Sequence, residues 1–287
     1  MEIPGNTPLI PFSLLKVGDN RIFVKDESQN PTGSIKDRAV YQMLYEAKEL
    51  GKLANHPTII EATSGNTGIS LGYYQKAFDY EAWIVMPQSA SPERKKLIES
   101  YGAKLVLVNG GMKECKEEVA RLLQIVPNSF ELDQFNNLGN LRAHSLYTAR
   151  EILRDCPAVT HIFAGIGTGG TLMGLAHFFS RYQVSLIGVE PAESPLLTEE
   201  WAGPHSIEGI GANFVPPFYE PEKITDVIDV PEEEAWKMAR LLREGGFDNG
   251  VSSGAALYGC IRYLRKKRIQ HAGAVVIFPD KGDRYSW

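Results

Sequence analysis

Hydrophobic positions follow two alternating patterns along the chain. Short runs rich in β-branched residues predict buried strands, and longer segments with apolar residues at helical spacing predict helices between them. The predicted strands are 21–27, 58–62, 81–87, 104–109, 160–164, 226–230 and 274–280. The predicted helices are 35–50, 68–78, 92–101, 112–125, 170–182 and 231–244. This alternation is typical of an α/β fold in which helices cover mainly parallel sheets.

Composition narrows the class of protein. The chain has 287 residues, of which 43% are hydrophobic and 23% charged, which suits one large or two modest domains. Its net charge of -5 argues against a nucleic-acid or membrane-surface binder, since those need a basic face. Three separated cysteines indicate neither a disulfide framework nor a metal site, and the N-terminus lacks a leader pattern. We therefore expect a cytoplasmic protein without a bound metal.

The segment FAGIGTGGTLMG, residues 163–174, is the first candidate for chemistry. Gly165, Gly167 and Gly170 have the G-x-G-x-x-G spacing of a dinucleotide-binding turn, between a predicted strand and a predicted helix. Glu190 follows about twenty residues later, where a ribose-binding acid is expected. This pattern supports an NAD-dependent oxidoreductase.

The same loop also fits a compact phosphate monoester. Threonine hydroxyls flank its glycine pair and add to the backbone donors of a helix N-terminus. A dinucleotide turn usually opens its βαβ series, whereas this loop comes after the midpoint of the chain. The residues in question are Gly167, Thr168, Gly169, Gly170 and Thr171.

Lys36 is a candidate nucleophile. Ser34 and Asp37 form a capping-box-like pair, so Lys36 lies in the first turn of the predicted helix. A cation there opposes the helix dipole, which lowers the pKa of the amine and favours its neutral form. The alternative is a solvated surface lysine.

A third loop, in TIIEATSGNTG, combines hydroxyls, an amide and consecutive backbone N–H groups at a helix N-terminus, which suits a carboxylate. A well-capped turn is the alternative. Together, a phosphate loop, a carboxylate loop and an activated lysine suggest pyridoxal phosphate acting on an amino acid. The residues of this third loop are Thr63, Ser64, Gly65, Asn66 and Thr67.

Eight motifs, in order along the chain, resemble the cysteine synthase family, the β-family of pyridoxal-phosphate enzymes that includes cystathionine β-synthase. They lie at 5–9, 30–38, 61–68, 133–137, 167–171, 209–216, 251–257 and 279–285. The resemblance implies the tryptophan synthase β-like fold (fold type II), with two twisted, mainly parallel sheets flanked by helices. It also implies a smaller, movable substrate-binding domain at 36–138 and a larger cofactor-binding domain of 1–35 plus 139–287.

The resemblance also implies roles for individual residues. Lys36 would carry the cofactor as a Schiff base and act as general base, Asn66 would contact the phenolic oxygen, and Ser252 would face the pyridine nitrogen. For Ser252 a helix N-cap is the alternative. The phosphate would lie on Gly167, Thr168, Gly169, Gly170 and Thr171. The substrate carboxylate would lie on Thr63, Ser64, Gly65, Thr67 and Gln134.

The implied reaction joins O-acetyl-L-serine and sulfide to give L-cysteine and acetate through an aminoacrylate. Alternatives within the class use serine or cysteine, in cystathionine synthesis or sulfide-releasing exchange, or take thiosulfate as acceptor. Asn213 stands where relatives have glycine or aspartate, and it could orient a second substrate but not act as a carboxylate base. The family also implies a homodimer and suggests serine acetyltransferase as a partner.

Overall fold

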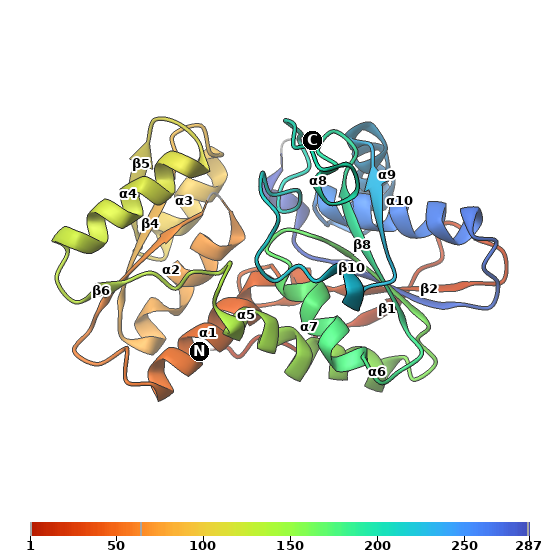
Figure 1. Ribbon diagram of the computed structural model, residues 1–287, viewed down its shortest axis with the longest axis horizontal. Coiled ribbons are helices and arrows are strands. Elements are labelled where there is room, and N and C mark those ends of the chain that lie inside the picture. Colours follow the sequence, from red (N-terminus) through yellow and green to blue (C-terminus); the bar gives the residue numbers. More distant parts are fainter. Residues whose placement is uncertain (1, 64, 286) are drawn as a thin grey trace. The chain divides into compact units, whose positions relative to one another are not determined.

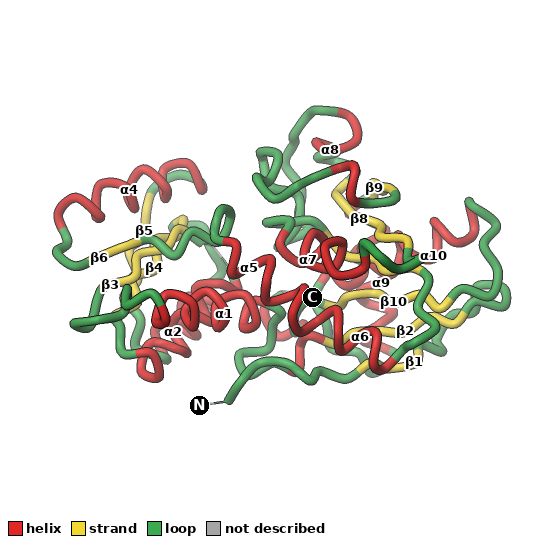
Figure 2. Tube along the Cα trace, turned by 60° about the horizontal axis from the view of Figure 1, so that its bottom comes forward, coloured by secondary structure: helices red, strands yellow, loops and turns green. Residues whose placement is uncertain are grey.

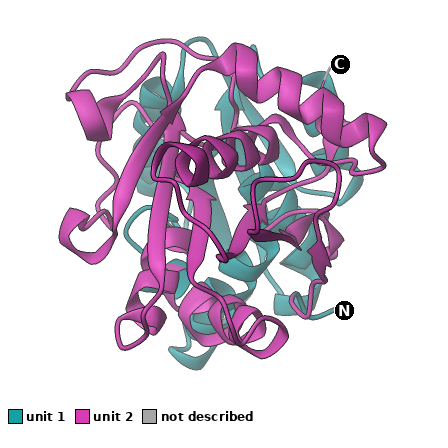
Figure 3. Ribbon diagram, turned by 90° about the vertical axis from the view of Figure 1, so that its right-hand side faces the viewer, with its two compact units in different colours: residues 1–4, 36–140 teal, residues 5–35, 141–287 magenta. Residues whose placement is uncertain are grey.

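The computed structural model describes residues 2–63, 65–285 and 287, which form two compact α/β units. Unit 1 comprises 1–4 and 36–140, and unit 2 comprises 5–35 and 141–287 (Figure 3). Each contains a mainly parallel sheet flanked by helices, which confirms the predicted fold class. That the smaller unit moves as a domain stays a prediction.

Unit 1 is built on a four-stranded, fully parallel sheet in the order β5-β4-β3-β6 (Figure 1). Successive residues of its central strand point to opposite faces, as the strand pleat requires. Ile59 packs with side chains of α1, α2 and α3, and Ile60 packs with side chains of α4. The strands are β3 (Thr58–Ala62), β4 (Glu81–Pro87), β5 (Lys104–Val108) and β6 (Ser129–Phe130). The helices are α1 (Lys36–Glu49), α2 (Asn66–Phe78), α3 (Pro92–Ser100) and α4 (Met112–Ile125).

Unit 2 is built on a six-stranded sheet in the order β1-β2-β10-β7-β8-β9. All neighbours are parallel except β1 and β2. Val276 of β10 packs with α10 and α9, and Val275 packs on the opposite face with α6 and α7. The strands are β1 (Leu9–Pro11), β2 (Arg21–Asp26), β7 (His161–Gly165), β8 (Ser185–Pro191), β9 (Asp226–Val230) and β10 (Gly273–Phe278).

The helices of unit 2 complete both layers (Figure 2). They are α6 (Ala149–Asp155), α7 (Gly170–Phe179), α8 (Leu196–Glu199), α9 (Glu232–Glu244) and α10 (Val251–Lys266). Helix α5 (Leu138–Ala143) precedes a π-helical turn at His144–Thr148, and short 3-10 turns lie at Glu27–Gln29, Pro221–Lys223 and Gly282–Arg284. Among the described residues, no helix is both long and apolar enough to cross a membrane.

The predicted strands and helices agree with the structure to within a few residues at each end, but β8, α8 and α10 are not among them. Strands β1 and β6, with three and two residues, were not predicted because a strand this short cannot show an alternating pattern. The helical stretch from Leu138 to Asp155 was also not predicted. A π-helical turn interrupts the 3.6-residue period there, which weakens the periodic signal.

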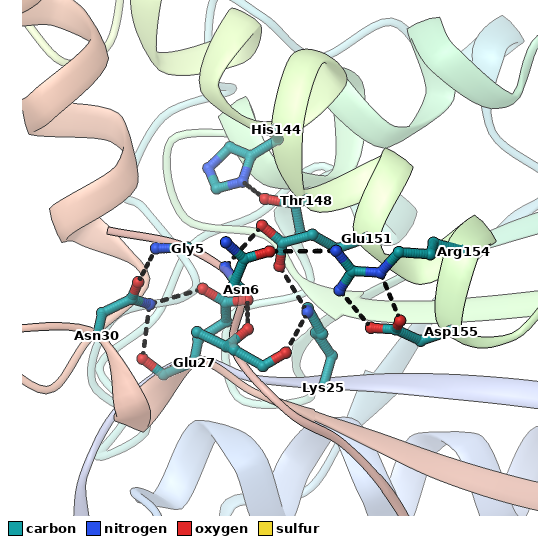
Figure 4. Close-up of polar contacts among 11 residues, drawn as sticks. Gly5, Asn6, Lys25, Glu27, Asn30, His144, Thr148, Glu151, Arg154 and Asp155 are labelled. Atoms are coloured by element: carbon teal, nitrogen blue, oxygen red, sulfur yellow. Dashed lines mark hydrogen bonds and ion pairs between the residues drawn. The ribbon is translucent and has the colours of Figure 1, made fainter. Parts of the chain in front are cut away.

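A buried polar network fixes residues 5–9, the N-terminal segment of unit 2 (Figure 4). Lys25 is fully buried, and its Nζ donates to Glu151 Oε2 at 2.7 Å and to the Thr7 carbonyl at 2.6 Å. Glu151 Oε1 accepts the Asn6 N–H at 2.9 Å. On the other side, the Thr7 hydroxyl donates to Glu27 Oε1 at 2.8 Å. Because the charge of Lys25 is paired and hydrogen-bonded, the network fixes residues 5–9 without leaving an uncompensated buried cation.

Candidate active site

Lys36 is the first residue of α1 and is half-buried. The residue before it, Ile35, donates its N–H to the Pro279 carbonyl at 2.8 Å, so the chain enters the helix from a fixed point. Asp37 is buried and accepts a hydrogen bond from Ser70 Oγ of α2 at 2.6 Å. The start of α1 is therefore anchored directly beside the lysine.

The loop between β3 and α2 forms the second group of predicted residues. Gly65 is the N-cap of α2 and Asn66 is its first residue. Thr63 Oγ1 accepts the Gly65 N–H at 3.2 Å, which links the end of β3 to the N-cap of α2. Ser64, also predicted to bind the substrate carboxylate, lies outside the described residues.

Thr67 and Gln134 are brought together although 67 positions separate them in the sequence. The Thr67 hydroxyl donates to Gln134 Oε1 at 2.7 Å, and both residues are buried. Gln134 accepts through its oxygen, so Nε2 is the donor end of its amide. Unit 1 thus places a glutamine amide next to the N-terminal turn of α2, where the helix dipole favours an anion.

In unit 2 the glycine-rich loop between β7 and α7 has the geometry of an anion cradle. Gly170 begins α7, and Gly169 has a φ of 82°, which side chains other than glycine rarely adopt. A Cβ at Gly167 would lie 2.4 Å from the Gly209 carbonyl oxygen. The loop can therefore hold its backbone donors at the helix start only with glycine at these positions.

His144 was not predicted as part of this site. It is buried in the π-helical turn, its Nε2 lies 3.3 Å from Thr171 Oγ1, and its Nδ1 lies 3.0 Å from Thr148 Oγ1. His144 therefore orients one of the hydroxyls predicted to bind phosphate. Nothing in the local sequence pattern indicates this contact.

Ser252 is buried in the first turn of α10. The alternative role considered above, the helix N-cap, is wrong because Gly250 occupies that position. A Cβ on Gly250 would come within 2.3 Å of Asp280 Oδ1, so the close approach of Asp280 requires glycine there. Ser252 is consequently not needed as a cap.

Gly165 and Glu190 have structural roles in unit 2. A Cβ on Gly165 would lie 2.5 Å from Ile210 Cγ2, so this glycine allows close packing at the end of β7. The buried carboxylate of Glu190 accepts the N–H groups of Leu197 at 2.9 Å and Thr198 at 3.0 Å, which holds the start of α8. Burial raises the pKa of Glu190. Both carboxylate oxygens of Glu190 are engaged with the chain itself.

The described residues fit pyridoxal phosphate by their chemistry. Unit 2 contributes a glycine cradle at a helix N-terminus, which suits a phosphate, and a buried hydroxyl on α10. Unit 1 contributes a half-buried lysine and a helix N-terminus bordered by a glutamine amide. These are the donor types that a phosphorylated aldehyde cofactor and an amino-acid carboxylate need.

Comparison with known proteins identifies the family. The family model described as pyridoxal-phosphate dependent enzyme matches residues 1–280. Cysteine synthase B of Campylobacter jejuni is 42% identical, over 99% of this chain and 95% of that protein. A hydrogen sulfide-producing enzyme from Fusobacterium nucleatum has 36% identity and a TM-score of 0.95, covering 99% of this chain and 98% of that chain. O-acetyl serine sulfhydrylase isoform 3 from Entamoeba histolytica has 38% identity and a TM-score of 0.93, covering 99% and 88%.

These matches identify the cofactor. The matching family is pyridoxal-phosphate dependent, which overturns the NAD-dependent alternative. That the glycine loop binds the phosphate of this cofactor stays a prediction. The agreement extends over nearly the whole chain and includes both units. The chain therefore belongs to the family of pyridoxal-phosphate dependent enzymes.

Proposed function

We propose that this enzyme is a cysteine synthase that joins O-acetyl-L-serine and sulfide to form L-cysteine and acetate. The observation that carries this proposal is the nearly full-length similarity to relatives named cysteine synthase, at 42% and 36% identity. The carboxylate-binding geometry around the start of α2 supports an amino-acid substrate.

Lys36 holds the cofactor through its amine, and the loop from Gly167 to Thr171 binds the phosphate. Asn66 contacts the phenolic oxygen, and the hydroxyl of Ser252 lies at the pyridine nitrogen. A neutral hydroxyl there, unlike a carboxylate, leaves the ring largely unprotonated. When bound, pyridoxal phosphate supplies an electron-withdrawing ring that makes the Cα–H bond of an amino acid acidic.

The other residues bind the substrate and move its proton. The substrate carboxylate is bound by Thr63, Ser64, Gly65, Thr67 and Gln134. Once the substrate amine has replaced the Lys36 amine on the cofactor, the freed Lys36 amine accepts the proton from Cα as general base. Acetate then leaves from Cβ. Sulfide then adds at Cβ, and the same lysine returns a proton to Cα. The order of these steps predicts ping-pong kinetics.

The cellular setting is also part of the proposal. Cys115, Cys156 and Cys260 are buried free thiols, which suits a reducing compartment such as the cytoplasm. The enzyme acts as a homodimer, its smaller unit moves on substrate binding, and serine acetyltransferase is a partner.

The visible spectrum of the purified enzyme tests the proposal. The protein should be yellow, its spectrum should change on addition of O-acetyl-L-serine alone, and sulfide should restore the first spectrum while L-cysteine forms. The proposal would be contradicted if the protein stayed colourless after pyridoxal phosphate was added. It would also be contradicted if O-acetyl-L-serine did not change the spectrum.

A second candidate function is release of sulfide from L-cysteine. It is favoured by the similarity to the Fusobacterium nucleatum enzyme, at a TM-score of 0.95. Rates should be compared under the same conditions for O-acetyl-L-serine with sulfide or thiosulfate as acceptor, and for L-serine and L-cysteine with a thiol or water as acceptor, because L-cysteine with sulfide only regenerates itself. A higher kcat/KM for L-cysteine than for O-acetyl-L-serine would select this second function.

A further inference from the structure

A carboxylate is buried in unit 1 near the point where the edge strand β6 stops pairing with β3. Glu61 lies on β3 and is 2% exposed. Strand β6 pairs with β3 at only two positions, Thr58 with Ser129 and Ile59 with Phe130. Beyond Phe130 the chain leaves the ladder, so the following backbone N–H groups need other acceptors.

The side chain of Glu61 supplies two of these acceptors. Its Oε2 accepts the N–H of Asp133 at 2.9 Å, and its Oε1 accepts the N–H of Gln134 at 3.2 Å. Asp133 has a left-handed backbone with a φ of 55°, a conformation that is unfavourable for a residue other than glycine. The Glu61 carboxylate therefore accepts the N–H groups that no longer have a strand partner. In this way it stabilises the unfavourable backbone conformation of Asp133.

Gln134 is held on three sides as a result. Its N–H donates to Glu61, its carbonyl accepts from Asn140 Nδ2 at 2.8 Å, and its Oε1 accepts from Thr67 at 2.7 Å. The first two contacts fix the backbone and the third fixes the amide. The direction in which Gln134 presents its Nε2 donor thus depends on Glu61.

We propose that Glu61 is a positioning residue, whose carboxylate fixes the 131–137 loop so that Gln134 can bind the carboxylate of the amino-acid substrate. This inference rests on the proposed function, which assigns Gln134 to that carboxylate. The hydrogen bonds of Glu61 described above go to backbone N–H groups, so Glu61 acts through Gln134.

The charge of Glu61 sets how strongly it holds the loop. Burial, and then the neighbouring carboxylates of Glu131 and Asp133, raise its pKa to about 8 against the opposing effect of the two N–H donors. Burial, and then Asp133, also raise the pKa of Glu131, against the opposing effect of the Lys116 ammonium. Both oxygens of Glu61 accept well only when the carboxyl is ionised, because protonation turns one of them into an O–H donor. The hold on the loop should therefore strengthen as the pH rises through about 8.

The variant Glu61→Gln tests the proposal, because its amide keeps the shape but turns one acceptor into a donor. At pH 8.5, where Glu61 is mostly ionised, hydrogen exchange followed by mass spectrometry should show faster exchange in peptides covering 131–137 and unchanged exchange elsewhere in unit 1. At pH 8.5 we expect KM for O-acetyl-L-serine to rise about tenfold, with kcat within about twofold and KM for sulfide unchanged. At pH 6.5 the two enzymes should differ little.

Glu131→Gln is the matched control, because it removes a neighbouring charge and leaves both N–H contacts of Glu61 in place. It should keep KM at pH 8.5, where Glu61 is ionised in both enzymes, and it should move the pH dependence of KM to lower pH. Unchanged exchange in 131–137, or equal rises in KM for both substrates, would overturn the proposal.

If Glu61→Gln exchanges rapidly throughout, Glu61→Asp replaces it, since the shorter side chain keeps the charge but cannot reach both N–H groups. It must then show the selective rise in KM, and its absence would overturn the proposal. A wild-type enzyme that ignores O-acetyl-L-serine would instead refute the proposed function, and the exchange of 131–137 would still decide the role of Glu61.

Discussion

At the scale of single residues, Lys36 has two proposed roles, since it would bind the cofactor and act as general base. It begins α1, and its neighbours on both sides are fixed, Ile35 through its backbone and Asp37 through Ser70. A side chain held in this way needs little reorganisation to reach a reacting group. Its role in binding the cofactor stays a prediction.

We predict that Lys36→Ala abolishes turnover, lowering kcat by at least about a thousandfold, because loss of a general base alone costs a factor of 100 to 10,000. Borohydride reduction followed by peptide mass spectrometry should label Lys36 in the wild-type enzyme. Lys48→Ala, an exposed lysine on the same helix, is the control and should keep both activity and labelling. Labelling of another lysine would refute the assignment.

Glu61 should also affect stability. Its pKa is about 8 in the folded chain and near the ordinary value of 4.5 when unfolded. The folded state therefore binds more protons between these values, so this group stabilises fully below about pH 4.5, and its contribution is lost as pH rises through about 8. Urea titrations should show this decline over the pH window in the wild type and a flatter profile in Glu61→Gln. Identical slopes would contradict the assignment of the raised pKa.

At the scale of elements, two loop-to-helix junctions carry the candidate site. One is the β3–α2 junction of unit 1 and the other is the β7–α7 junction of unit 2. Both lie at the carboxyl end of a parallel strand, where α/β sheets usually bind their ligands. Their positions were predictable because a buried strand, a glycine loop and a helix follow one another directly in the sequence.

The β7–α7 loop should tolerate no side chain at Gly167. The Cβ of Gly167→Ala would lie 2.4 Å from a backbone oxygen, so the loop must shift and lose its phosphate geometry. We expect the purified variant to lose most of its visible absorbance and to bind added pyridoxal phosphate at least about tenfold more weakly.

Gly111→Ala is the matched control for this substitution. Gly111 is also a glycine at a helix start, and its added Cβ makes only an ordinary contact at 3.7 Å. It should keep the absorbance of the wild type. Retained absorbance in Gly167→Ala would remove the loop from the phosphate site.

At the scale of the whole molecule, the two units have separate sheets and separate cores. The predicted site residues are divided between the units. Lys36, Asn66 and the residues predicted to bind the substrate carboxylate belong to unit 1, and the 167–171 loop and Ser252 belong to unit 2. Neither unit alone contains all of the predicted site residues.

The predicted homodimer is tested by mass. The chain has a mass of 31.8 kDa, so light scattering after size exclusion should give about twice that value. The measurement should be repeated over a tenfold range of protein concentration, because a dimer that dissociates would show a falling mass. A mass of one chain at every concentration would refute the dimer.

The amino-acid sequence by itself determined the α/β class, the starts of α1, α2 and α7, and the residue types at those starts. These features are local, since strand, glycine loop and helix signals are read within about twenty residues. The family motifs, including 167–171 and 251–257, added the cofactor and the predicted roles.

Only the tertiary structure decided which distant residues meet. The hydrogen bond from Thr67 to Gln134 spans 67 positions, and the hold of Glu61 on Asp133 spans 72. Both depend on the sheet order, which places β6 beside β3 although β4 and β5 lie between them in the sequence. The contact of His144 with Thr171 likewise joins residues that are far apart in the sequence. Such contacts arise from burial and hydrogen-bond satisfaction in the folded chain, and no local periodicity encodes them.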